Sequence, residues 1–223
     1  MTKLNIFITG SNGSLGKSLI KVFKSDEYQL ILHSRKKSKR PNKINEEINY
    51  DYIYGDFSKQ NDLNSILNNL KKKRIDILIN NAGIHNFDNL KNLNIKKLRE
   101  IFEINFFSCA AISQVIFNKM LKRNKGIIIN INSIAGKVSN GNELSYCASK
   151  AALRSLSETL QINSIGSNIE IINIYPGAFK SKITKSRDNY SQLMDPDEIS
   201  QMIYDLCKQR KTLKVSEISI FRK

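Results

Sequence analysis

A tyrosine and a lysine four positions apart, Tyr146 and Lys150, have residue types and a spacing that suit proton transfer. In a helix, positions i and i+4 share one face, so the phenol and the ammonium can interact directly. A free phenol has a pKa of about 10 and exchanges protons poorly at neutral pH unless its anion is stabilised. Two unit charges roughly 4 Å apart interact by about 4 kcal/mol at an effective dielectric near 20, on the order of three pKa units. The pair therefore predicts a general acid or base whose pKa is lowered by Lys150.

Ser133 is the third candidate for chemistry, and it lies on the turn after a predicted strand that ends at Asn132. Its hydroxyl would hydrogen-bond a substrate oxygen where negative charge develops. Serine hydrolase chemistry is a weaker interpretation, because Ser133 lies in the run Asn-Ser-Ile-Ala-Gly rather than in G-x-S-x-G. Neither His33 nor His85 has a motif that would support a role as its base. We therefore expect Ser133 to orient a carbonyl oxygen and Tyr146 to protonate it.

A glycine-rich stretch between the first predicted strand and the first predicted helix indicates a dinucleotide-binding loop. Gly10 permits a tight turn, and Gly16 allows close helix packing. Gly13 and Ser14 let the backbone approach a pyrophosphate, which the helix N-terminus would then face. Glycine-rich turns also occur simply to connect elements, so the position of the loop gives it its weight. The expected contact residues are Gly10, Ser11, Asn12, Gly13, Ser14, Leu15 and Gly16.

The end of the second predicted strand indicates which dinucleotide is bound. Proteins that prefer NAD usually place Asp or Glu there to accept from the ribose 2′-hydroxyl. From Gln29 to Asn45 the chain has no carboxylate. It has instead His33, Ser34, Arg35, Lys36 and Lys37, a group that matches a 2′-phosphate. Most of this basic run is a solvated loop, but Ser34 and Arg35 are the expected phosphate contacts, and we predict NADP, reduced as NADPH, as the cofactor.

The elements that must position these residues follow a regular alternation. Short Ile- and Val-rich runs alternate with longer segments of helical period, which predicts an α/β fold with a doubly wound parallel sheet. The seven predicted strands are Leu4 to Thr9, Tyr28 to His33, Ile48 to Tyr54, Ile75 to Asn80, Gly126 to Asn132, Ile169 to Tyr175 and Lys214 to Ile220. The predicted helices are Ser14 to Lys24, Lys59 to Lys72, Ile95 to Leu121, Tyr146 to Ile165 and Asp197 to Gln209. We expect one Rossmann-fold domain over residues 1–223, with its substrate segment at about 178–196.

Composition bounds the class of protein. Of the 223 residues 40% are hydrophobic, enough for one substantial core. Three scattered cysteines, Cys109, Cys147 and Cys207, suit free thiols in a reducing compartment better than a disulfide framework. The sequence shows neither a signal peptide nor eighteen consecutive apolar residues. We expect a cytoplasmic protein with no membrane segment and no metal site.

The formal net charge of +16 raises the question of nucleic acid. Lysines are spread along the whole chain beside abundant Asn and Ile, a pattern that a coding bias toward AT-rich codons would equally produce. No zinc-finger spacing, aromatic-basic RNA-binding signature or heptad series accompanies the charge. We therefore expect no specific nucleic-acid partner, and the charge is either functional or compositional.

From Leu4 to about Gly177 the motifs resemble, in type and order, those of the short-chain dehydrogenase/reductase family. Its Y-x-x-x-K motif matches Tyr146 with Lys150, and Ser133 lies thirteen residues before the tyrosine. The N-N-A-G stretch after the fourth predicted strand is Asn80-Asn81-Ala82-Gly83. The resemblance implies an NAD(P)-dependent dehydrogenase or reductase with a tyrosine as its proton donor.

The resemblance also implies roles for residues outside the catalytic pair. It implies that Asn105 closes a proton relay to Lys150 and that Lys150 contacts the nicotinamide ribose. It further implies that Asp56, with Phe57, contacts the adenine ring. The remaining implied cofactor contacts are Asn81, Ala82 and Gly83 on the ribose side, and Pro176, Gly177 and Ile183 on the nicotinamide side.

Two departures from the family pattern bear on the branch and the assembly. The glycines at 10, 13 and 16 follow the spacing of the longer, nucleotide-sugar-modifying branch, but the sequence ends at Lys223 without room for that branch's C-terminal domain. We therefore expect the shorter branch. The C-terminal run Val215 to Ile220 lacks the glycine pair that often closes that branch. The segments Ile95 to Leu121 and Tyr146 to Ile165 resemble the helices of the family's four-helix interface, which implies a homo-oligomer, dimer or tetramer.

The expected function is NADPH-dependent interconversion of a carbonyl and an alcohol by hydride transfer, with Tyr146 as general acid/base. The alternatives are a catalytically weak cofactor-binding regulator, or a family member acting on a sugar or an acyl-carrier intermediate. The substrate segment is basic, which favours an anionic small-molecule substrate, although general lysine richness explains the charge almost as well. Its cations are Lys180, Lys182, Lys185 and Arg187. Substrate identity and physiological direction stay open at this level.

Overall fold

The protein is built around one parallel sheet in a computed structural model that describes residues 3–36, 50–208 and 213–223. Within these residues the strands are β1 (Leu4–Ile8), β2 (Tyr28–Ser34), β3 (Asp51–Tyr54), β4 (Ile77–Asn80), β5 (Gly126–Ile131), β6 (Ile169–Pro176) and β7 (Glu217–Ile220). Their order is β3-β2-β1-β4-β5-β6-β7, and every neighbouring pair is parallel. The predicted doubly wound sheet is confirmed, with strand ends shifted by one to three residues.

The helices connect these strands on both faces of the sheet. They are α1 (Ser14–Val22), α2 (Gln60–Lys72), α3 (Ile95–Phe102), α4 (Ser108–Arg123), α5 (Leu144–Asn163) and α6 (Pro196–Leu206), with a π-helical turn, η1 (Glu103–Phe107), between α3 and α4. Two short 3-10 turns, η2 (Ile134–Gly136) and η3 (Tyr190–Gln192), follow β5 and precede α6. The helix expected from Ile95 to Leu121 is therefore continuous in space but contains a π turn, which a period of 3.6 does not reveal.

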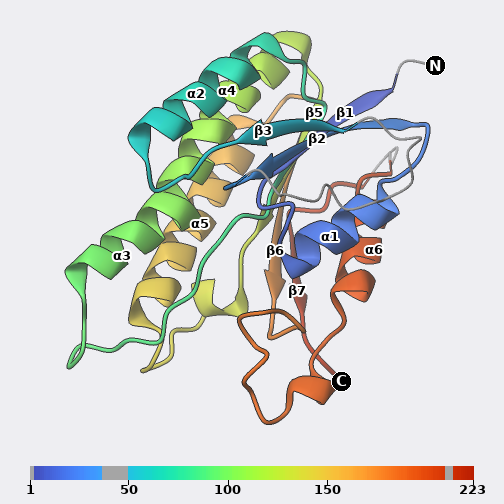
Figure 1. The fold of residues 1–223 in the computed structure, drawn as a ribbon. Helices are drawn as coiled ribbons and strands as arrows, with labels where there is room; N and C mark the ends of the chain where they lie inside the picture. Colours follow the sequence, from blue (N-terminus) through green and yellow to red (C-terminus); the bar gives the residue numbers. More distant parts are fainter. Residues whose placement is uncertain (1–2, 37–49, 209–212) are drawn as a thin grey trace.

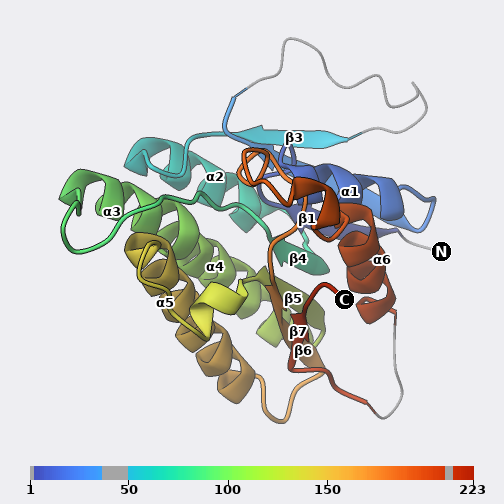
Figure 2. The same ribbon diagram turned by 90° about the horizontal axis from the view of Figure 1, so that it is seen from below.

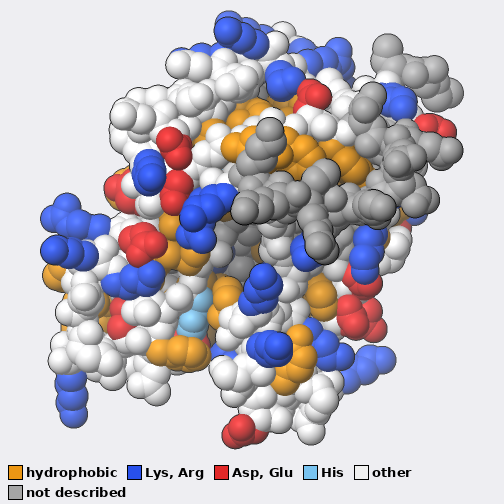
Figure 3. Space-filling view, in the orientation of Figure 1, with side chains coloured by type: hydrophobic (Ala, Val, Ile, Leu, Met, Phe, Trp, Pro, Cys, Tyr) orange, Lys and Arg blue, Asp and Glu red, His pale blue; other side chains and the backbone are white. Residues whose placement is uncertain are grey.

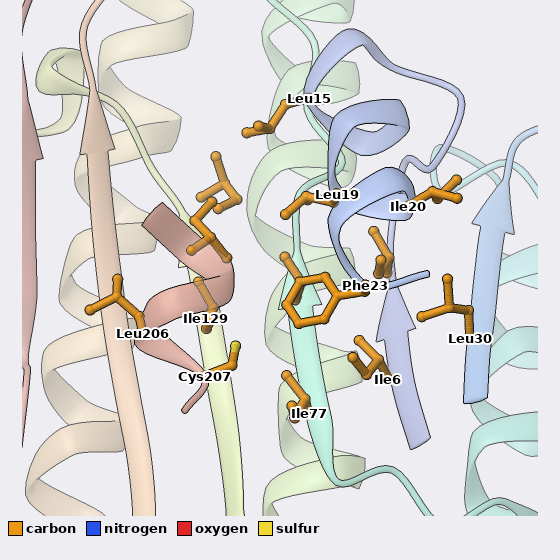
Figure 4. Packing of buried hydrophobic residues seen from close by; sticks show 14 of the residues in the cluster. Ile6, Leu15, Leu19, Ile20, Phe23, Leu30, Ile77, Ile129, Leu206 and Cys207 are labelled. Carbon is orange, nitrogen blue, oxygen red and sulfur yellow. The ribbon is translucent and has the colours of Figure 1, made fainter. Parts of the chain in front are cut away.

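Two hydrophobic layers lie on either side of the sheet (Figures 1 and 2). On one face α1 and α6 pack onto the strands, and Figure 4 shows Leu19 and Phe23 of α1 pointing toward Ile6 and Ile77. On the other face α2, α4 and α5 cover a second cluster that includes Ile128. Because helices cover both faces of the sheet, nearly all side chains of the central strands are hydrophobic.

The rod from Ile95 to Arg123 is long and apolar enough to cross a membrane by length and composition alone. Core helices of soluble proteins pass the same test, and half of its apolar window is buried inside this fold. Ile101, Ile112 and Ile116 lie fully in the core, packed under the sheet. The burial explains the apolar composition without a membrane.

Because all strands run parallel, their carboxyl ends meet at one edge of the sheet. The described connections that leave this edge include residues 9–13 after β1, 55–59 after β3, 81–94 after β4, 132–143 after β5 and 177–195 after β6. Strand order reverses between β1 and β4, and ligands of open α/β sheets bind in the crevice at such a switch point. The fold therefore brings the predicted phosphate loop and the predicted catalytic residues to the same edge.

Candidate active site

The loop after β1 is shaped by two glycines that no other residue can replace without rearrangement. Gly10 has a φ of 64°, which glycine adopts without strain. A Cβ on Gly10 would lie 2.8 Å from the Ala82 Cα, and a Cβ on Gly16 would lie 2.5 Å from the Gly10 carbonyl oxygen. The loop is therefore packed tightly between α1 and the segment after β4. Backbone atoms, rather than side chains, form its surface at these glycines.

The N-terminus of α1 fits a bound phosphate group. Gly13 is its N-cap, no side chain caps the first turn, and no acidic residue lies in that turn. Backbone N–H groups at a helix N-terminus and the helix dipole together favour an anion. Leu15 is buried in the core, so it can serve a ligand only through its backbone. These features match the pyrophosphate of a dinucleotide.

His33, at the end of β2, supports the phosphate loop from the core side. Its Nδ1 accepts a hydrogen bond from the Gly10 N–H at 3.3 Å, so Nε2 carries the proton and donates to the Gly55 carbonyl at 3.0 Å. The ring stacks on Phe57 with centroids 3.9 Å apart. Burial lowers the pKa of His33 to about 4. The ring is therefore buried and neutral, and it supports the loop rather than contributing charge to the predicted 2′-phosphate site.

The side chains around the predicted 2′-phosphate site are connected to the loop. Ser11 Oγ donates to the His33 carbonyl at 2.9 Å. Asn12 Nδ2 donates to Ser34 Oγ at 2.6 Å, and Ser34 Oγ donates to the Lys36 carbonyl at 3.0 Å. The buried Ser34 hydroxyl is therefore already engaged. Arg35 is exposed at the same edge, whereas Lys37 lies outside the described residues.

Asp56 and Phe57 begin the connection from β3 to α2. The Asp56 Oδ1 accepts from the Ser58 N–H at 3.0 Å and from the Ser58 hydroxyl at 2.8 Å. Burial raises the pKa of the Asp56 carboxyl, but these hydrogen bonds and the Arg35 charge outweigh it and lower the pKa overall. The Phe57 ring is buried against His33, so its side chain supports the site from the core side.

The segment after β4 is tied to the phosphate loop. Thr9 Oγ1 accepts from the backbone N–H groups of Asn81 and Ala82, both at 2.9 Å. Asn81 Nδ2 donates to the carbonyls of Thr9 at 2.9 Å and Gly10 at 3.1 Å. Gly83 follows with an exposed backbone. The predicted ribose-side residues therefore share one rigid corner with the predicted phosphate-side residues.

The predicted catalytic residues meet beyond this corner. Ser133 caps η2 by accepting from the Ala135 N–H at 3.1 Å, and its side chain lies close enough to the Tyr146 phenol to oppose the rise in that group's pKa. Lys150 Nζ lies 5.8 Å from the centre of the Tyr146 ring and donates to the Ile131 carbonyl at 2.8 Å. The fold brings all three side chains together at the ends of β5 and α5.

The electrostatics of this group differ from the expectation. Burial raises the pKa of Tyr146 to about 12, with the Ser133 hydrogen bond opposing and the Glu143 charge adding to the rise. Burial also lowers the pKa of Lys150 to about 8. The prediction that Lys150 lowers the Tyr146 pKa is therefore wrong for this structure. Loss of water disfavours both ions, and the ammonium is directed at a backbone carbonyl rather than at the phenol oxygen.

Asn105 lies in the π turn η1, a feature often found at functional sites. Its Oδ1 accepts from the Ile84 N–H at 2.8 Å, and its Nδ2 donates to the Ile84 carbonyl at 2.9 Å and to Ser149 Oγ at 3.0 Å. A Cβ on Gly83 would lie 3.4 Å from Asn105 Oδ1 and 3.7 Å from Lys150 Nζ. The polar groups of Asn105 and Lys150 therefore face the same small region beside Gly83.

The turn after β6 reaches the same edge. Gly177 donates its N–H to the Ile220 carbonyl at 2.8 Å, and the buried Pro176 ends the strand. The Ile183 side chain is 49% exposed and lies outside the core. Thr184 is buried instead, and its hydroxyl donates to the Phe179 carbonyl at 2.7 Å. The segment is thus held by Thr184, with Ile183 at its surface.

Three residues that lie near Tyr146 were not predicted to share a site. The His85 ring lies 4.8 Å from the Tyr146 ring, and His85 Nε2 lies 3.1 Å from Glu143 Oε1. Arg187 from the substrate segment approaches the same Glu143 oxygen at 3.6 Å. Glu143 could have been found, because it lies one helical turn before Tyr146, but Arg187 is too distant in sequence for any spacing rule.

Among the described residues, no group of three or more His, Cys, Asp or Glu side chains could hold a metal ion. The three cysteines are buried, and none of them forms a disulfide in the structure. Burial raises the pKa of the Cys109 thiol to about 12, so it is not a reactive thiolate at neutral pH. The chemistry of this edge therefore depends on its hydroxyl, phenol, imidazole and ammonium groups.

Solved structures with this fold include dinucleotide complexes. ElxO with NADP bound aligns with a TM-score of 0.87 at 24% identity, covering 98% of this chain and 97% of that one. 4-Hydroxyisoleucine dehydrogenase complexed with NADH aligns with a TM-score of 0.87 at 21% identity, with the same coverage of 98% and 97%. At these identities the likeness shows the shared fold.

Sequence comparisons agree with the geometry. The NADP-dependent 3-hydroxy acid dehydrogenase of Schizosaccharomyces pombe is 27% identical over 97% of this chain and 91% of that protein. The uncharacterized oxidoreductase YvrD of Bacillus subtilis is 30% identical over 77% of this chain and 67% of that protein. The family model for short chain dehydrogenase matches residues 4–191. The chain therefore belongs to the short-chain dehydrogenase/reductase family of NAD(P)-dependent oxidoreductases.

Proposed function

We propose that this protein is an NADPH-dependent oxidoreductase that interconverts a small-molecule carbonyl and an alcohol, with Tyr146 as general acid/base. One observation carries the proposal. The Tyr146 phenol lies beside Ser133 and the Lys150 cation, at the sheet edge that also carries the glycine loop. Few other tasks require a phenol, a hydroxyl and a buried ammonium in this arrangement.

Each catalytic side chain has a role that follows from its surroundings. The dinucleotide, when bound, supplies or accepts the hydride. The Tyr146 phenol, with a pKa of about 12, keeps its proton at neutral pH and can donate it to a carbonyl oxygen. Ser133 hydrogen-bonds that oxygen and orients it. Lys150, with a pKa of about 8, is mostly cationic at pH 7, and we propose that it holds the nicotinamide ribose beside the phenol, as the family resemblance implies. We propose that Asn105 completes the proton path to Lys150.

The proposed preference for NADPH rests on the end of β2. No carboxylate occurs from Gln29 to Asn45, and Arg35 is exposed beside the phosphate loop. A guanidinium can pair in a fork with a phosphate, which would favour the 2′-phosphate of NADP. The NADP-dependent relative from Schizosaccharomyces pombe supports this choice.

The proposed setting is a cytoplasmic homo-oligomer built from one domain. The three free cysteines support a reducing compartment. Phe107 and Leu121 remain 48% and 42% exposed on the η1–α4 rod, and Ile162 and Ile165 are 66% and 79% exposed at the end of α5. Exposed apolar side chains on neighbouring helices are typical of a face that packs against a partner.

The test of this function is turnover. Purified protein would be mixed with NADPH and a panel of ketones, aldehydes, keto sugars and 3-oxoacyl thioesters, and the loss of NADPH absorbance would be followed. We expect at least one carbonyl class to be reduced, and the reaction to run backward with NADP and the matching alcohol. Tight NADPH binding without turnover of any class would instead identify a cofactor-binding regulator.

A further inference from the structure

Three charged or titratable side chains that the proposed proton transfer does not use lie together beside Tyr146. They come from three connections far apart in sequence: His85 after β4, Glu143 at the start of α5, and Arg187 in the substrate segment. On the face shown in Figure 3, Lys and Arg side chains lie around the middle of the molecule, and a histidine is visible among them. We call His85, Glu143 and Arg187 the charged wall.

Glu143 is the centre of the charged wall. Its side chain is only 13% exposed. One oxygen, Oε2, accepts from Asn140 Nδ2 at 2.7 Å, and the other, Oε1, faces His85 and Arg187. A carboxylate with so little water needs donors around it. Glu143 therefore lies between His85 and Arg187, and the His85 ring in turn lies against Tyr146.

Arg187 is bound loosely in this arrangement. Its single ion pair within the described residues is the 3.6 Å contact with Glu143, and its side chain is 37% exposed. A guanidinium offers five donors and binds a carboxylate best as a two-pronged fork. The contact with Glu143 uses little of that capacity. Arg187 therefore keeps donors that a second anionic partner could use.

His85 provides an independent sign of an absent binding partner. Its Nε2 is buried, and the close approach to Glu143 is too poorly directed to count as a hydrogen bond among the described residues. Its ring lies against the Tyr146 ring. A buried polar nitrogen without a partner is costly, and it marks a position where a bound polar group would be favourable.

We infer that the charged wall recognises a carboxylate, so that the substrate is a short oxo acid or hydroxy acid whose acid group binds Arg187. In binding, the substrate carboxylate would replace Glu143 as the close partner of Arg187 and accept a hydrogen bond from His85 Nε2, while Asn140 stays with Glu143. The carbonyl or hydroxyl of the same molecule would then reach Ser133 and Tyr146. This inference rests on the proposed function and names its substrate class.

The inference can be tested with pairs of substrates that differ only in charge. Oxo acids with the carbonyl at position 2, 3 or 4 would each be compared with their methyl esters, using NADPH at saturation. The measured quantity is the ratio of kcat/KM for an acid to that for its ester, which cancels changes at Tyr146 itself. We expect wild type to prefer the best acid by at least about tenfold, the lower range for a charge-assisted hydrogen bond.

Variants separate recognition from a structural role. Arg187→Gln should lower the acid-to-ester ratio by about ten- to a hundredfold and leave ester turnover nearly unchanged. Glu143→Gln should raise the ratio, because it removes the competing carboxylate. A purely structural ion pair would make both variants change the ratio in the same way. Lys185→Gln is the matched control, since Lys185 is an exposed cation of the same segment, and its ratio should stay within about twofold of wild type.

Three outcomes would overturn the inference. The first is that wild type uses acids and esters equally well. The second is that Arg187→Gln lowers kcat/KM equally for both. Either result would disprove recognition of a carboxylate while leaving the oxidoreductase function in place. Preference for phosphate esters over carboxylates would assign Arg187 to a different anion. If no acid, ester or other carbonyl compound leads to consumption of NADPH, the proposed function fails together with this inference. Failure of the carboxylate inference alone would still leave NADPH consumed by some carbonyl, so the two failures can be told apart.

Discussion

Lys150 Nζ donates a hydrogen bond to the Ile131 backbone carbonyl at 2.8 Å. The lysine on α5 is therefore attached to the carboxyl end of β5, two residues before Ser133. Among the described residues no carboxylate hydrogen-bonds this buried ammonium, and burial lowers its pKa to about 8. The bond fixes the distance between the cation and the phenol, so the geometry of proton transfer is set by the sheet as well as by the helix.

Tyr146→Phe should abolish most turnover and leave NADPH affinity nearly unchanged. The substitution removes the hydroxyl that Ser133 orients and that we expect to carry the proton, while the ring keeps its place against His85. We expect kcat to fall by at least about a hundredfold, the low end for general acid catalysis. Steady-state kinetics and a fluorescence titration with NADPH would check both parts. A Tyr146→Phe enzyme with a near wild-type rate would end the mechanism.

Arg35→Ala should reduce the preference for NADPH over NADH. Charge-assisted hydrogen bonds contribute roughly 1.5 to 3 kcal/mol each, so one or two predict about ten- to several-hundredfold discrimination in wild type. High salt should weaken NADPH binding more than NADH binding, because the extra phosphate pairs with an exposed cation. KM values for both cofactors would be measured at low and high salt. Lys36→Ala, at the adjacent exposed lysine, is the control and should have the smaller effect; equal KM values in wild type would falsify the assignment.

The buried His33 predicts that stability falls on the acid side. Its pKa is lowered to about 4 in the folded protein from an ordinary value near 6.5, so the unfolded chain binds more protons between these values. Stability is therefore complete above about pH 6.5 and is lost as pH falls toward 4. At pH 5 we expect a loss of about 2 kcal/mol relative to pH 7 from this group. Urea unfolding of wild type and His33→Gln at both pH values would isolate it, and identical losses in the two proteins would exclude His33 as the cause.

Gly16→Ala should destabilise the fold and weaken NADPH binding. The new Cβ would lie 2.5 Å from the Gly10 carbonyl oxygen and 2.8 Å from the Ser11 Cα, so the phosphate loop must shift. Overpacking of this kind typically costs about 1 to 3 kcal/mol. Gly141→Ala is the control, since nothing lies within 4 Å of its added Cβ. Urea midpoints and the KM for NADPH would be compared, and equal values for the two variants would contradict the close approach.

The exposed apolar face of the η1–α4 rod and α5 predicts a homo-oligomer. Light scattering at micromolar concentration should give a mass at least twice the 25.5 kDa of one chain. Ile162→Glu should lower that mass by placing a charge on the face, whereas Lys208→Glu, an exposed change just after α6 on the other face of the sheet, should not. A wild-type monomer at that concentration would rule the interface out.

Several features followed from the sequence because they are local or periodic. The alternation of Ile-rich runs with helical segments was enough to predict a parallel sheet. The strands of such a sheet are covered by helices on both faces and therefore consist almost entirely of hydrophobic residues. The shared helix face of Tyr146 and Lys150 needs only a spacing of four. The π turn at Asn105 was missed, because one extra residue in a helical turn leaves no signal in an apolar period.

The sequence by itself determined the α/β fold, the family and the edge at which the candidate catalytic residues lie, because each depends on motifs within one element or on the order of elements. Only the tertiary structure decided the electrostatics. Burial, which is a property of the packed whole, raises the Tyr146 pKa, lowers the Lys150 pKa and makes His33 a neutral support instead of a phosphate ligand. The meeting of His85, Glu143 and Arg187 was likewise decided by the fold, since their connections leave three different elements and converge only where parallel strands end.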